Sequence, residues 1–288
     1  MIKIAFVVLH YIVDKDTIEC VESIRKHIDI NEYKIIIVDN CSPNDSYSVL
    51  KEKYQSDDDI VLIHNDENLG FAKGNNVGFR YAKTHFHPEF IIMMNNDILL
   101  IEGGLYQKIS SEYRNSNFAV LGPMIYTKDG KCNSNPLRKS ALTLSDVDYM
   151  MKDIKRKKFW GKRHMERFYV KLCKPKDVTQ PHKADDFIHR QENVCLHGCF
   201  WVFSRGFMQT FNGLDEGTFL YVEEDILYTQ LSDKKMKTVY LPEIRIYHKE
   251  DSAANAVASS KHEKRMRFYE NLYRSLIRLK EILEERED

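Results

Sequence analysis

The chain has 288 residues, and its 43 Lys and Arg are balanced by 43 Asp and Glu, so its formal net charge is zero. This balance excludes a protein that binds nucleic acid through bulk electrostatic attraction, which requires an excess of basic residues. The longest apolar runs, at residues 4–9 and 90–94, are too short for a transmembrane helix, which needs ~20 residues. The N-terminal residues also lack the pattern of a signal peptide, and we therefore expect a cytoplasmic protein.

The first hundred residues alternate short apolar runs with amphipathic segments. This alternation predicts the α/β class, with a mostly parallel central sheet flanked by helices. Strands are expected at residues 2–9, 34–40, 60–64 and 90–97, and helices at residues 16–28, 49–54 and 72–83. Asp16 and Glu19 have the spacing of a capping box, which places the start of the first helix at Asp16.

The regular pattern weakens after residue 128. Residues 130–194 lack a clear period, and residues 152–176 contain eleven Lys and Arg against two acidic residues. We interpret residues 130–194 as a variable basic insertion. Strand patterns return at residues 199–203 and 238–248.

The C-terminal segment, residues 261–288, is expected to form an amphipathic helix. Its apolar residues are spaced three and four apart, as on one face of a helix. They are Tyr269, Leu272, Leu276, Leu279 and Leu283. We therefore expect one domain at residues 1–260, built from residues 1–128, the insertion and residues 195–260, with this helix after it.

Polar residues follow three of the predicted strands. They are His10 and Tyr11, then Asp39 and Asn40, then Asn95, Asn96 and Asp97. In open α/β sheets, ligands bind outside the carboxyl ends of the strands, so these side chains would face one cleft if their strands are neighbours. Asp and Asn also form turns at strand ends, and Asp39 taken alone fits either interpretation equally.

A Gly- and Asn-rich loop at residues 65–79 precedes and begins a predicted helix. Asn68, Gly70, Gly74 and Asn75 could bring backbone N–H groups and a helix N-terminus to a phosphate. The loop has neither the GxGxxG spacing of a dinucleotide site nor the GKS or GKT of a P-loop. A plain turn into a helix is the other interpretation.

Two further groups of residues could carry chemistry. Asp97 could hold Mg²⁺ jointly with a diphosphate, and His248, at the end of a predicted strand, is the candidate second ligand, although such a His is often only packed. Glu223, Glu224 and Asp225 begin a predicted helix. They either interact favourably with the helix dipole or supply a general base that deprotonates a hydroxyl nucleophile.

Seven motifs, in order along the chain, resemble those of family 2 glycosyltransferases with the GT-A fold. They are VVLHY, IIIVDNCSPNDS, NLGFAKGNN, MMNND, HGCFWVFSRGFM, GLDEGTFLYVEEDILYTQL and VYLPEIRIYHKEDS. The nearest subset is the rhamnosyltransferase-like enzymes of bacterial surface-polysaccharide assembly. The resemblance covers residues 1–128 and about 195–275 and leaves the insertion out.

This resemblance implies inverting transfer of a sugar from a UDP- or dTDP-sugar to an acceptor hydroxyl, with Mn²⁺ or Mg²⁺ as cofactor. It makes residues 1–128 the nucleotide-binding half and residues 195–260 the acceptor and catalytic half. Nucleotide contacts are implied for Leu9, His10, Tyr11, Asp39, Asn68, Gly70, Phe71, Gly74, Asn75, Asn95 and Asn96. Asp97 and His248 fall at the metal positions.

The resemblance leaves the catalytic base between two carboxylates. The family often reads EDVDLCLR where this chain reads EEDILYTQ. Ungapped alignment places the base at Glu224, and a shift by one residue would make it Asp225. Gln230 stands in place of the usual Arg, so a charge contact of the family is absent here.

Alternatives remain at this point. A sugar nucleotidyltransferase would need a Gly-rich basic loop after the first strand, where this chain reads LHYIVDKD. A non-catalytic nucleotide- or carbohydrate-binding scaffold would retain the fold without the chemistry. Besides the nucleotide-sugar, the expected partner is a saccharide or lipid-linked acceptor and not nucleic acid. The basic residues of the insertion and of residues 261–280 either contact anionic lipid on the inner membrane face or form an ordinary solvated surface.

Overall fold

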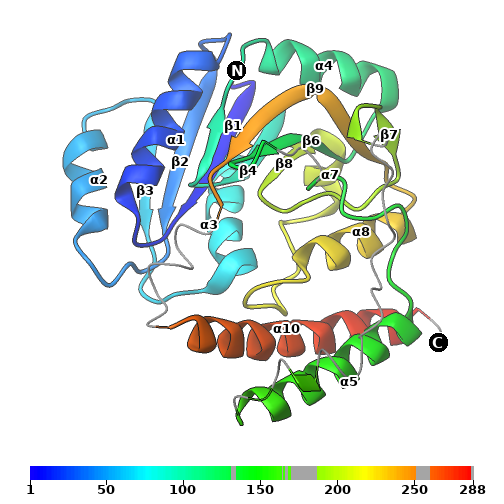
Figure 1. The fold of residues 1–288 in the computed structure, drawn as a ribbon. Helices are drawn as coiled ribbons and strands as arrows, with labels where there is room; N and C mark the ends of the chain where they lie inside the picture. Colours follow the sequence, from blue (N-terminus) through cyan, green and yellow to red (C-terminus); the bar gives the residue numbers. More distant parts are fainter. Residues whose placement is uncertain (131–133, 164, 166–167, 170–186, 251–259, 287–288) are drawn as a thin grey trace.

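A computed structural model describes residues 1–130, 134–163, 165, 168–169, 187–250 and 260–286. Its centre is one twisted sheet with helices on both faces (Figure 1). The strands are β1 (Ile4–His10), β2 (Tyr33–Asp39), β3 (Ile60–His64), β4 (Phe90–Asn95), β5 (Ile98–Leu100), β6 (Val120–Thr127), β7 (Gln191–Glu192), β8 (Phe200–Ser204) and β9 (Thr238–His248). The helices are α1 (Asp14–His27), α2 (Ser46–Tyr54), α3 (Gly70–His85), α4 (Leu105–Ser116), α5 (Leu144–Gly161), α7 (Arg205–Thr210), α8 (Glu223–Asp233) and α10 (Lys261–Glu284).

The strand order is β3-β2-β1-β4-β8-β6-β9-β5, and β7 pairs with β9. The first four strands in this order are parallel, as expected from the sequence. Strand β8 runs antiparallel to both β4 and β6, and β5 and β7 run antiparallel to β9, which makes the far half of the sheet mixed. The α/β sheet flanked by helices is thereby confirmed.

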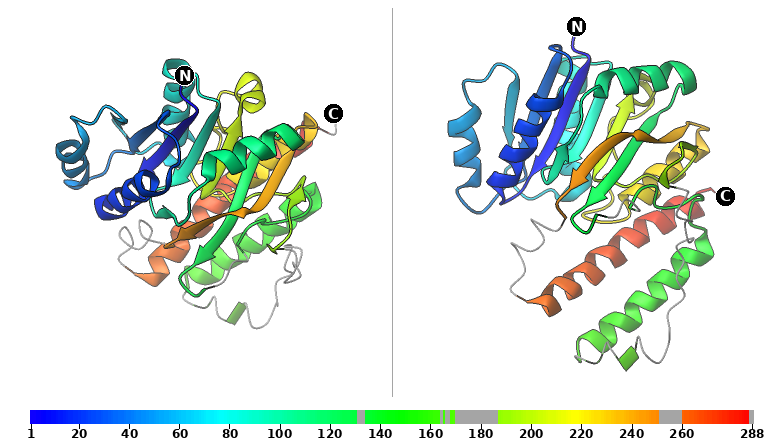
Figure 2. Two further views of the ribbon diagram at one scale, coloured as in Figure 1. Left: turned by 90° about the horizontal axis from the view of Figure 1, so that it is seen from above. Right: turned by 45° about the horizontal axis from the view of Figure 1, so that its top comes forward.

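Strand β1 is buried on both faces, which explains its nearly continuous apolar sequence. Ile4, Phe6 and Val8 pack into the core under α1, α2 and α4, whereas Ala5 and Val7 pack into the core under α3, α7 and α8. Figure 2 shows these helices on opposite sides of the sheet. Helix α3 can approach the strands closely because residue 78 is a glycine. A Cβ on Gly78 would lie only 2.5 Å from Cγ1 of Val7.

The start of the first helix differs from the prediction. Helix α1 begins at Asp14, with Val13 as N-cap and no side-chain cap, so the expected capping box is wrong. Asp16 and Glu19 instead form ion pairs with Lys249, which directly follows β9. Local spacing assigned these two carboxylates to a helix cap. In the folded protein they instead bind a lysine that lies 230 or more positions away in the sequence.

The predicted strand at residues 90–97 is shorter than expected. It ends at Asn95, and a tight turn through Asn96 and Asp97 leads into β5. The pairing of Ile98 with His248 then brings the end of β9 beside this turn. Helix α4 and strand β6 were not predicted from the sequence.

The segment interpreted as an irregular insertion contains a regular helix, α5. Thr143 caps this helix, and Thr143 and Asp146 form a capping box. Helix α5 packs against α10 through a third apolar cluster, which includes Val147, Ile154 and Leu279. The lack of regular pattern over residues 130–194 was therefore misleading for α5, while much of residues 164–186 lies outside the described residues.

Helix α10 confirms the C-terminal amphipathic helix. Four of its five predicted face residues are buried, namely Tyr269, Leu276, Leu279 and Leu283. Leu272 is partly buried against the same cluster. The domain limit at residue 260 stays a prediction. Among the helices that the structure describes, none is both long and apolar enough to cross a lipid bilayer.

Candidate nucleotide and active site

The carboxyl ends of β1, β2 and β4 meet at one edge of the sheet, because β1 lies between the other two strands. His10 is paired in register with Asp39, and Leu9 with Asn95. The polar residues that follow these three strands are thus brought together, as the sequence predicted for neighbouring strands.

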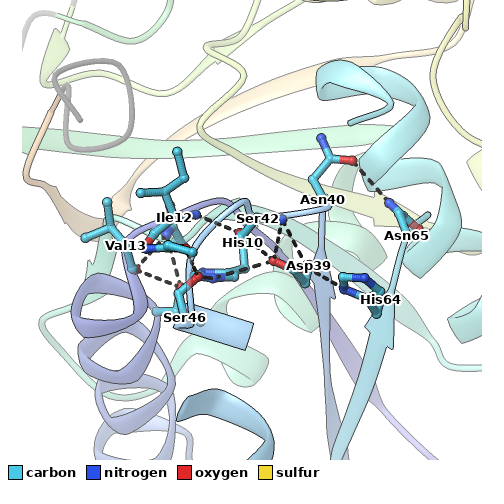
Figure 3. A network of polar contacts seen from close by, with 12 residues as sticks. His10, Ile12, Val13, Asp39, Asn40, Ser42, Ser46, His64 and Asn65 are labelled. Atoms are coloured by element: carbon cyan, nitrogen blue, oxygen red, sulfur yellow. Dashed lines mark hydrogen bonds and ion pairs between the residues drawn. The ribbon is translucent and has the colours of Figure 1, made fainter. Parts of the chain in front are cut away.

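Asp39 is the centre of a buried polar network at this edge (Figure 3). Its carboxylate is only 1% exposed and accepts hydrogen bonds from the Ser42 hydroxyl at 2.5 Å and from Nδ1 of His64 at 2.6 Å. The His64 ring lies against Tyr47, with ring centroids 4.6 Å apart, and is 40% exposed. His64 therefore connects the buried carboxylate to the surface of the site.

His10 is fully buried beneath this network, and the hydrogen bonds around it determine its tautomer. The Ser46 hydroxyl donates to Oδ1 of Asn44, so it accepts from Nε2 of His10 at 2.9 Å. Nδ1 of His10 lies 2.7 Å from the Thr17 hydroxyl, which can then donate to it. Burial lowers the pKa of His10 against the opposing charge of Asp39. The ring is therefore neutral and positions the end of β1; its direct contact with a nucleotide stays a prediction.

Asn96 belongs to the same network. Its Nδ2 donates to the Thr17 hydroxyl at 3.0 Å, so one threonine links the turn after β4 to His10 on β1. The Asn95 backbone N–H donates to the carbonyl of Cys199 on the approach to β8. The two Asn residues of the NND motif thus contribute to holding the turn in place beside Asp97.

Asn40 fixes the Gly- and Asn-rich loop against the end of β2. Its side-chain N–H groups donate to Oδ1 of Asn68 and to the carbonyl of Gly70, both at 3.0 Å. Its Oδ1 accepts from Nδ2 of Asn65 and from the backbone N–H of Leu69, both at 3.1 Å. This one side chain therefore sets where α3 begins relative to the strand ends.

Gly70 begins α3 in the left-handed conformation, with φ of +78°. A Cβ there would lie 2.3 Å from the carbonyl oxygen of Phe219, which also accepts from the N–H of Phe71 at 2.7 Å. A glycine is needed because the loop before α8 approaches α3 this closely. The Phe71 ring packs edge-on against Trp201, with centroids 6.3 Å apart.

The next predicted contacts of α3 are buried. A Cβ on Gly74 would lie 2.9 Å from Cδ1 of Leu9, so this glycine allows the helix to pack on β1. Asn75 is 1% exposed and donates to the carbonyl of Phe71 at 3.0 Å. In this structure both residues serve packing, and their contact with a nucleotide stays a prediction, as it does for Leu9 and Tyr11, which are partly buried.

Asp97 and His248 lie together at the predicted metal position. Nε2 of His248 is 3.3 Å from Oδ1 of Asp97. That oxygen is buried and has no hydrogen-bond partner in the described part of the chain. A buried carboxylate oxygen beside an imidazole fits a divalent cation that takes its other ligands from a diphosphate and water. No set of three or more potential ligands occurs in the described residues, so these residues alone supply only part of such a site.

His197, to which no role was assigned from the sequence, is close to both the metal pair and the start of α8. Its ring centroid is 6.0 Å from that of His248, and its Nδ1 accepts from the N–H of Cys199 at 3.1 Å. Burial lowers the pKa of His197, and the charges of Glu224 and Asp97 act on it in the opposite direction. A neutral ring is therefore close to both the candidate metal ligands and the candidate base.

The structure gives different surroundings to the two candidate bases. Asp225 forms an ion pair with Arg138, whose side chain is largely buried. Glu224 forms no ion pair within the described residues, and its Oε1 accepts from the N–H of Gly198 at 3.2 Å. A Cβ on Gly198 would lie 2.7 Å from that oxygen, so only glycine leaves room for it. These contacts favour Glu224 over Asp225 as a base.

Glu223 is buried at the start of α8 and accepts a hydrogen bond from the Thr218 hydroxyl at 2.8 Å. Burial, together with the neighbouring Glu224 carboxylate, raises the pKa of Glu223 to about 7. Between its ordinary pKa of 4.5 and this value, the folded protein holds a proton that the unfolded chain has lost. Stability therefore falls as the pH rises through that range.

Glu223→Gln is expected to remove this pH-dependent loss. The variant should match the parent near pH 4.5 and exceed it at pH 8, by up to about 3 kcal/mol, in urea unfolding followed at both pH values. Glu192→Gln serves as the control. Hydrogen bonds from Lys237 and Arg190 lower the pKa of Glu192, so its loss should destabilise the protein at pH 8. Equal pH dependence of parent and Glu223→Gln would contradict a raised pKa.

Two residues of the segment expected to be an insertion reach this site and were missed. Asn135 is fully buried; its Oδ1 accepts from the N–H of His197 at 2.9 Å, and its Nδ2 donates to the carbonyl of Pro123 at 2.7 Å. Arg138 reaches Asp225 from an isolated bridge with Cys195. Asn76 belongs to the predicted Gly- and Asn-rich loop, but its contact with the backbone of Leu214, which anchors the loop before α8, was not predicted. The sequence carried no local signal for these long-range contacts.

Comparisons with known proteins agree with this fold. The model of a family described as glycosyl transferase family 2 matches residues 6–210. The low-salt glycan biosynthesis hexosyltransferase Agl10 of Haloferax volcanii is 24% identical over 110 residues, which cover 38% of this chain and 34% of that protein. The uncharacterized glycosyltransferase MJ1057 of Methanocaldococcus jannaschii is 24% identical over 184 residues, 64% of this chain and 58% of that protein. The chain thus spans less than two thirds of either relative.

Solved structures share the fold at low sequence identity. TarS of S. aureus, in complex with UDP-GlcNAc, has a TM-score of 0.55 and 13% identity, and the match covers 87% of this chain and 59% of TarS. GalNAc-T7 with UDP, GalNAc and Mn²⁺ has a TM-score of 0.61 and 12% identity, with 88% of this chain and 45% of the other covered. At these identities the likeness concerns the arrangement of the sheet and its helices.

Proposed function

Since this chain belongs to glycosyl transferase family 2, we propose that it is an inverting enzyme that transfers a sugar from a UDP- or dTDP-sugar to an acceptor hydroxyl. The observation that carries the proposal is the position of Glu224. Its carboxylate has no counter-ion in the part of the chain described, is held by the N–H of Gly198, and acts on the pKa of the neighbouring His197 ring, as Asp97 and His248 also do. Direct displacement requires a base close to the residues that bind the diphosphate.

In the proposed reaction, Glu224 removes the proton of the acceptor hydroxyl as that oxygen attacks the anomeric carbon. The bond between this carbon and the diphosphate oxygen breaks, and the nucleoside diphosphate leaves with the bonding electron pair. A single displacement inverts the anomeric configuration. The negative charges of Glu224 and Asp225 also favour the oxocarbenium-like character of the transferring sugar.

Asp97 and His248 are the residues that would hold a divalent cation, Mn²⁺ or Mg²⁺. The cation would neutralise the charge that develops on the leaving diphosphate. The buried Oδ1 of Asp97, which lies beside His248 and accepts no hydrogen bond from the described residues, supports this assignment, and so does the Mn²⁺ that accompanies UDP in the GalNAc-T7 structure. The remaining side chains at this edge would orient the donor. In this proposal the Asp39–His64 pair contacts the pyrimidine ring of the nucleotide.

Synthesis of a surface polysaccharide or glycoconjugate is the proposed setting. Support comes from the relative Agl10, which is named as a hexosyltransferase of glycan biosynthesis. A non-catalytic scaffold is the second candidate, because NND offers one carboxylate and Gln230 stands where the family usually has Arg. A scaffold would bind the donor and leave it intact.

A donor screen tests the proposal. We expect the full chain to release UDP or dTDP from at least one matching nucleotide-sugar, faster with Mn²⁺ or Mg²⁺ than with EDTA. Calorimetric binding of UDP and dTDP is measured in parallel. Tight binding without release, with or without added saccharide acceptors, would support the scaffold. Formation of pyrophosphate from UTP and a sugar 1-phosphate would instead identify a nucleotidyltransferase.

A further inference from the structure

The outer face of α5 carries a stripe of basic residues. The exposed positions of the C-terminal two thirds of this helix and of the turn after it are spaced three and four apart, so they share one face. They are Lys152, Lys155, Arg156, Phe159, Lys162 and Arg163, and we call them the α5 stripe. It contains five cations and one aromatic residue and no acidic residue.

The acidic residues of α5 are turned away from the stripe or paired elsewhere. Asp153 is buried, accepts a hydrogen bond from the Tyr169 hydroxyl at 2.6 Å and forms an ion pair with Lys157. Asp148 pairs with Lys280 of α10 at 2.7 Å. Lys152 also interacts with Asp148, and most of the positive charge of the stripe is therefore not cancelled along its own helix.

Exposed apolar side chains lie within and just beyond the stripe. Phe159 is 52% exposed, Met165 is 42% exposed and Phe168 is 62% exposed. The guanidinium of Arg163 lies 3.8 Å from the centre of the Phe159 ring, so cation and ring form one exposed unit. Aromatic and basic side chains together on one helix face are typical of a surface that enters the interface of a bilayer.

Helix α5 is held firmly on the rest of the protein. Val147 and Ile154 pack on the apolar face of α10, and Lys158 pairs with Glu270 of α10. Figure 1 and Figure 2 show α5 on the outer side of α10, with the sheet on the other side. The stripe is therefore a rigid platform that faces away from the sheet.

The platform is connected to the start of the proposed catalytic helix. Val222 and Ile226, at the N-terminus of α8, pack in the same apolar cluster as α5 and α10. The Ser275 hydroxyl of α10 donates to the carbonyl of Leu220 at 2.9 Å. A surface bound at the stripe would thus lie on the side of the molecule where α8 begins.

We propose that the α5 stripe docks the protein on an anionic lipid bilayer, with the cations at the phosphate headgroups and Phe159 inserted between them. We choose an anionic bilayer as the binding partner because its charge is complementary to that of the stripe: each Lys or Arg near an anionic leaflet contributes to binding. The exposed apolar side chains distinguish a bilayer from a soluble polyanion, which offers them no apolar environment. The proposal stands whether or not the proposed transfer activity is found.

Vesicle flotation with the full chain tests the proposal. The protein is mixed with vesicles of 70% phosphatidylcholine and 30% phosphatidylglycerol, or of phosphatidylcholine alone, at two salt concentrations. The triple variant Lys152→Gln, Arg156→Gln, Lys162→Gln neutralises the stripe without touching Lys155, which lies over Tyr273, or Arg163. The control neutralises three exposed cations of α1, α2 and α4, namely Lys26→Gln, Lys51→Gln and Arg114→Gln.

We expect the parent protein to bind anionic vesicles only. The affinity for these vesicles should fall at least tenfold in the stripe variant and stay unchanged in the control variant. Phe159→Ala should weaken binding severalfold and leave its salt dependence in place, and circular dichroism checks that each variant is folded. Equal flotation of stripe variant and control would overturn the proposal. So would absence of flotation, or binding to heparin at least as tight as to the vesicles and insensitive to Phe159→Ala.

Discussion

Glu224→Gln is expected to lower the rate of sugar transfer by about 10²- to 10⁴-fold, the usual contribution of a general base. Glutamine keeps the size of the side chain, and its oxygen can still accept from the N–H of Gly198 at the distance of 3.2 Å seen here. It cannot take the proton of the acceptor. Nucleoside diphosphate binding, measured by calorimetry, should therefore change little while turnover with saturating donor and acceptor is lost.

Two further variants separate the base from its neighbours. Glu224→Asp should recover part of the activity because it restores a carboxylate. Asp225→Asn should act mainly on stability, since it leaves the largely buried guanidinium of Arg138 without its partner, at a cost of roughly 3–5 kcal/mol. If folded Asp225→Asn were inactive and Glu224→Gln fully active, the base would be Asp225 and our assignment would be wrong.

Strands β1, β2 and β4 could be predicted because each is an apolar run that is largely buried, and the edge strand β3 because four of its five residues are apolar. β1 and β3 fall within two residues of their expected limits, and the GT-A fold expected from the motif series is confirmed. Strand β6 was not predicted because Gly122 and Pro123 interrupt its apolar run, and both residues are poor strand formers. Helix α5 was not predicted because its many basic residues make the periodic spacing of its apolar residues hard to recognise in the sequence.

The candidate site could be predicted where it follows the strand ends and not where it depends on distant segments. Asp39, Asp97 and His248 were identified because they lie at or just after the ends of strands, and the sheet order brings these strand ends to one edge. Asn135 and Arg138 could not be identified, because their partners His197 and Asp225 lie 62 and more residues away. Local spacing also suggested a cap at Asp16 where the folded protein makes an ion pair with Lys249.

Asp97→Asn is expected to abolish the effect of Mn²⁺ on nucleotide binding. Asparagine keeps an oxygen for Nε2 of His248, which lies 3.3 Å from the carboxylate, so the turn after β4 should stay folded. It removes the negative charge of the proposed carboxylate ligand, which a hard divalent cation requires. UDP or dTDP affinity with Mn²⁺, at least tenfold above that with EDTA in the parent, should fall to the EDTA value in the variant.

His248→Gln provides the matched test of the proposed metal site, since Asp97 and His248 would both act through the same ion. The double variant should bind the nucleotide no more weakly than Asp97→Asn alone, because coupled residues lose their shared contribution only once. Additive losses would mean that the two side chains contact the nucleotide separately. If Mn²⁺ raised the affinity of Asp97→Asn as much as that of the parent, the ion would bind elsewhere, and the buried Oδ1 of Asp97 would need a different partner.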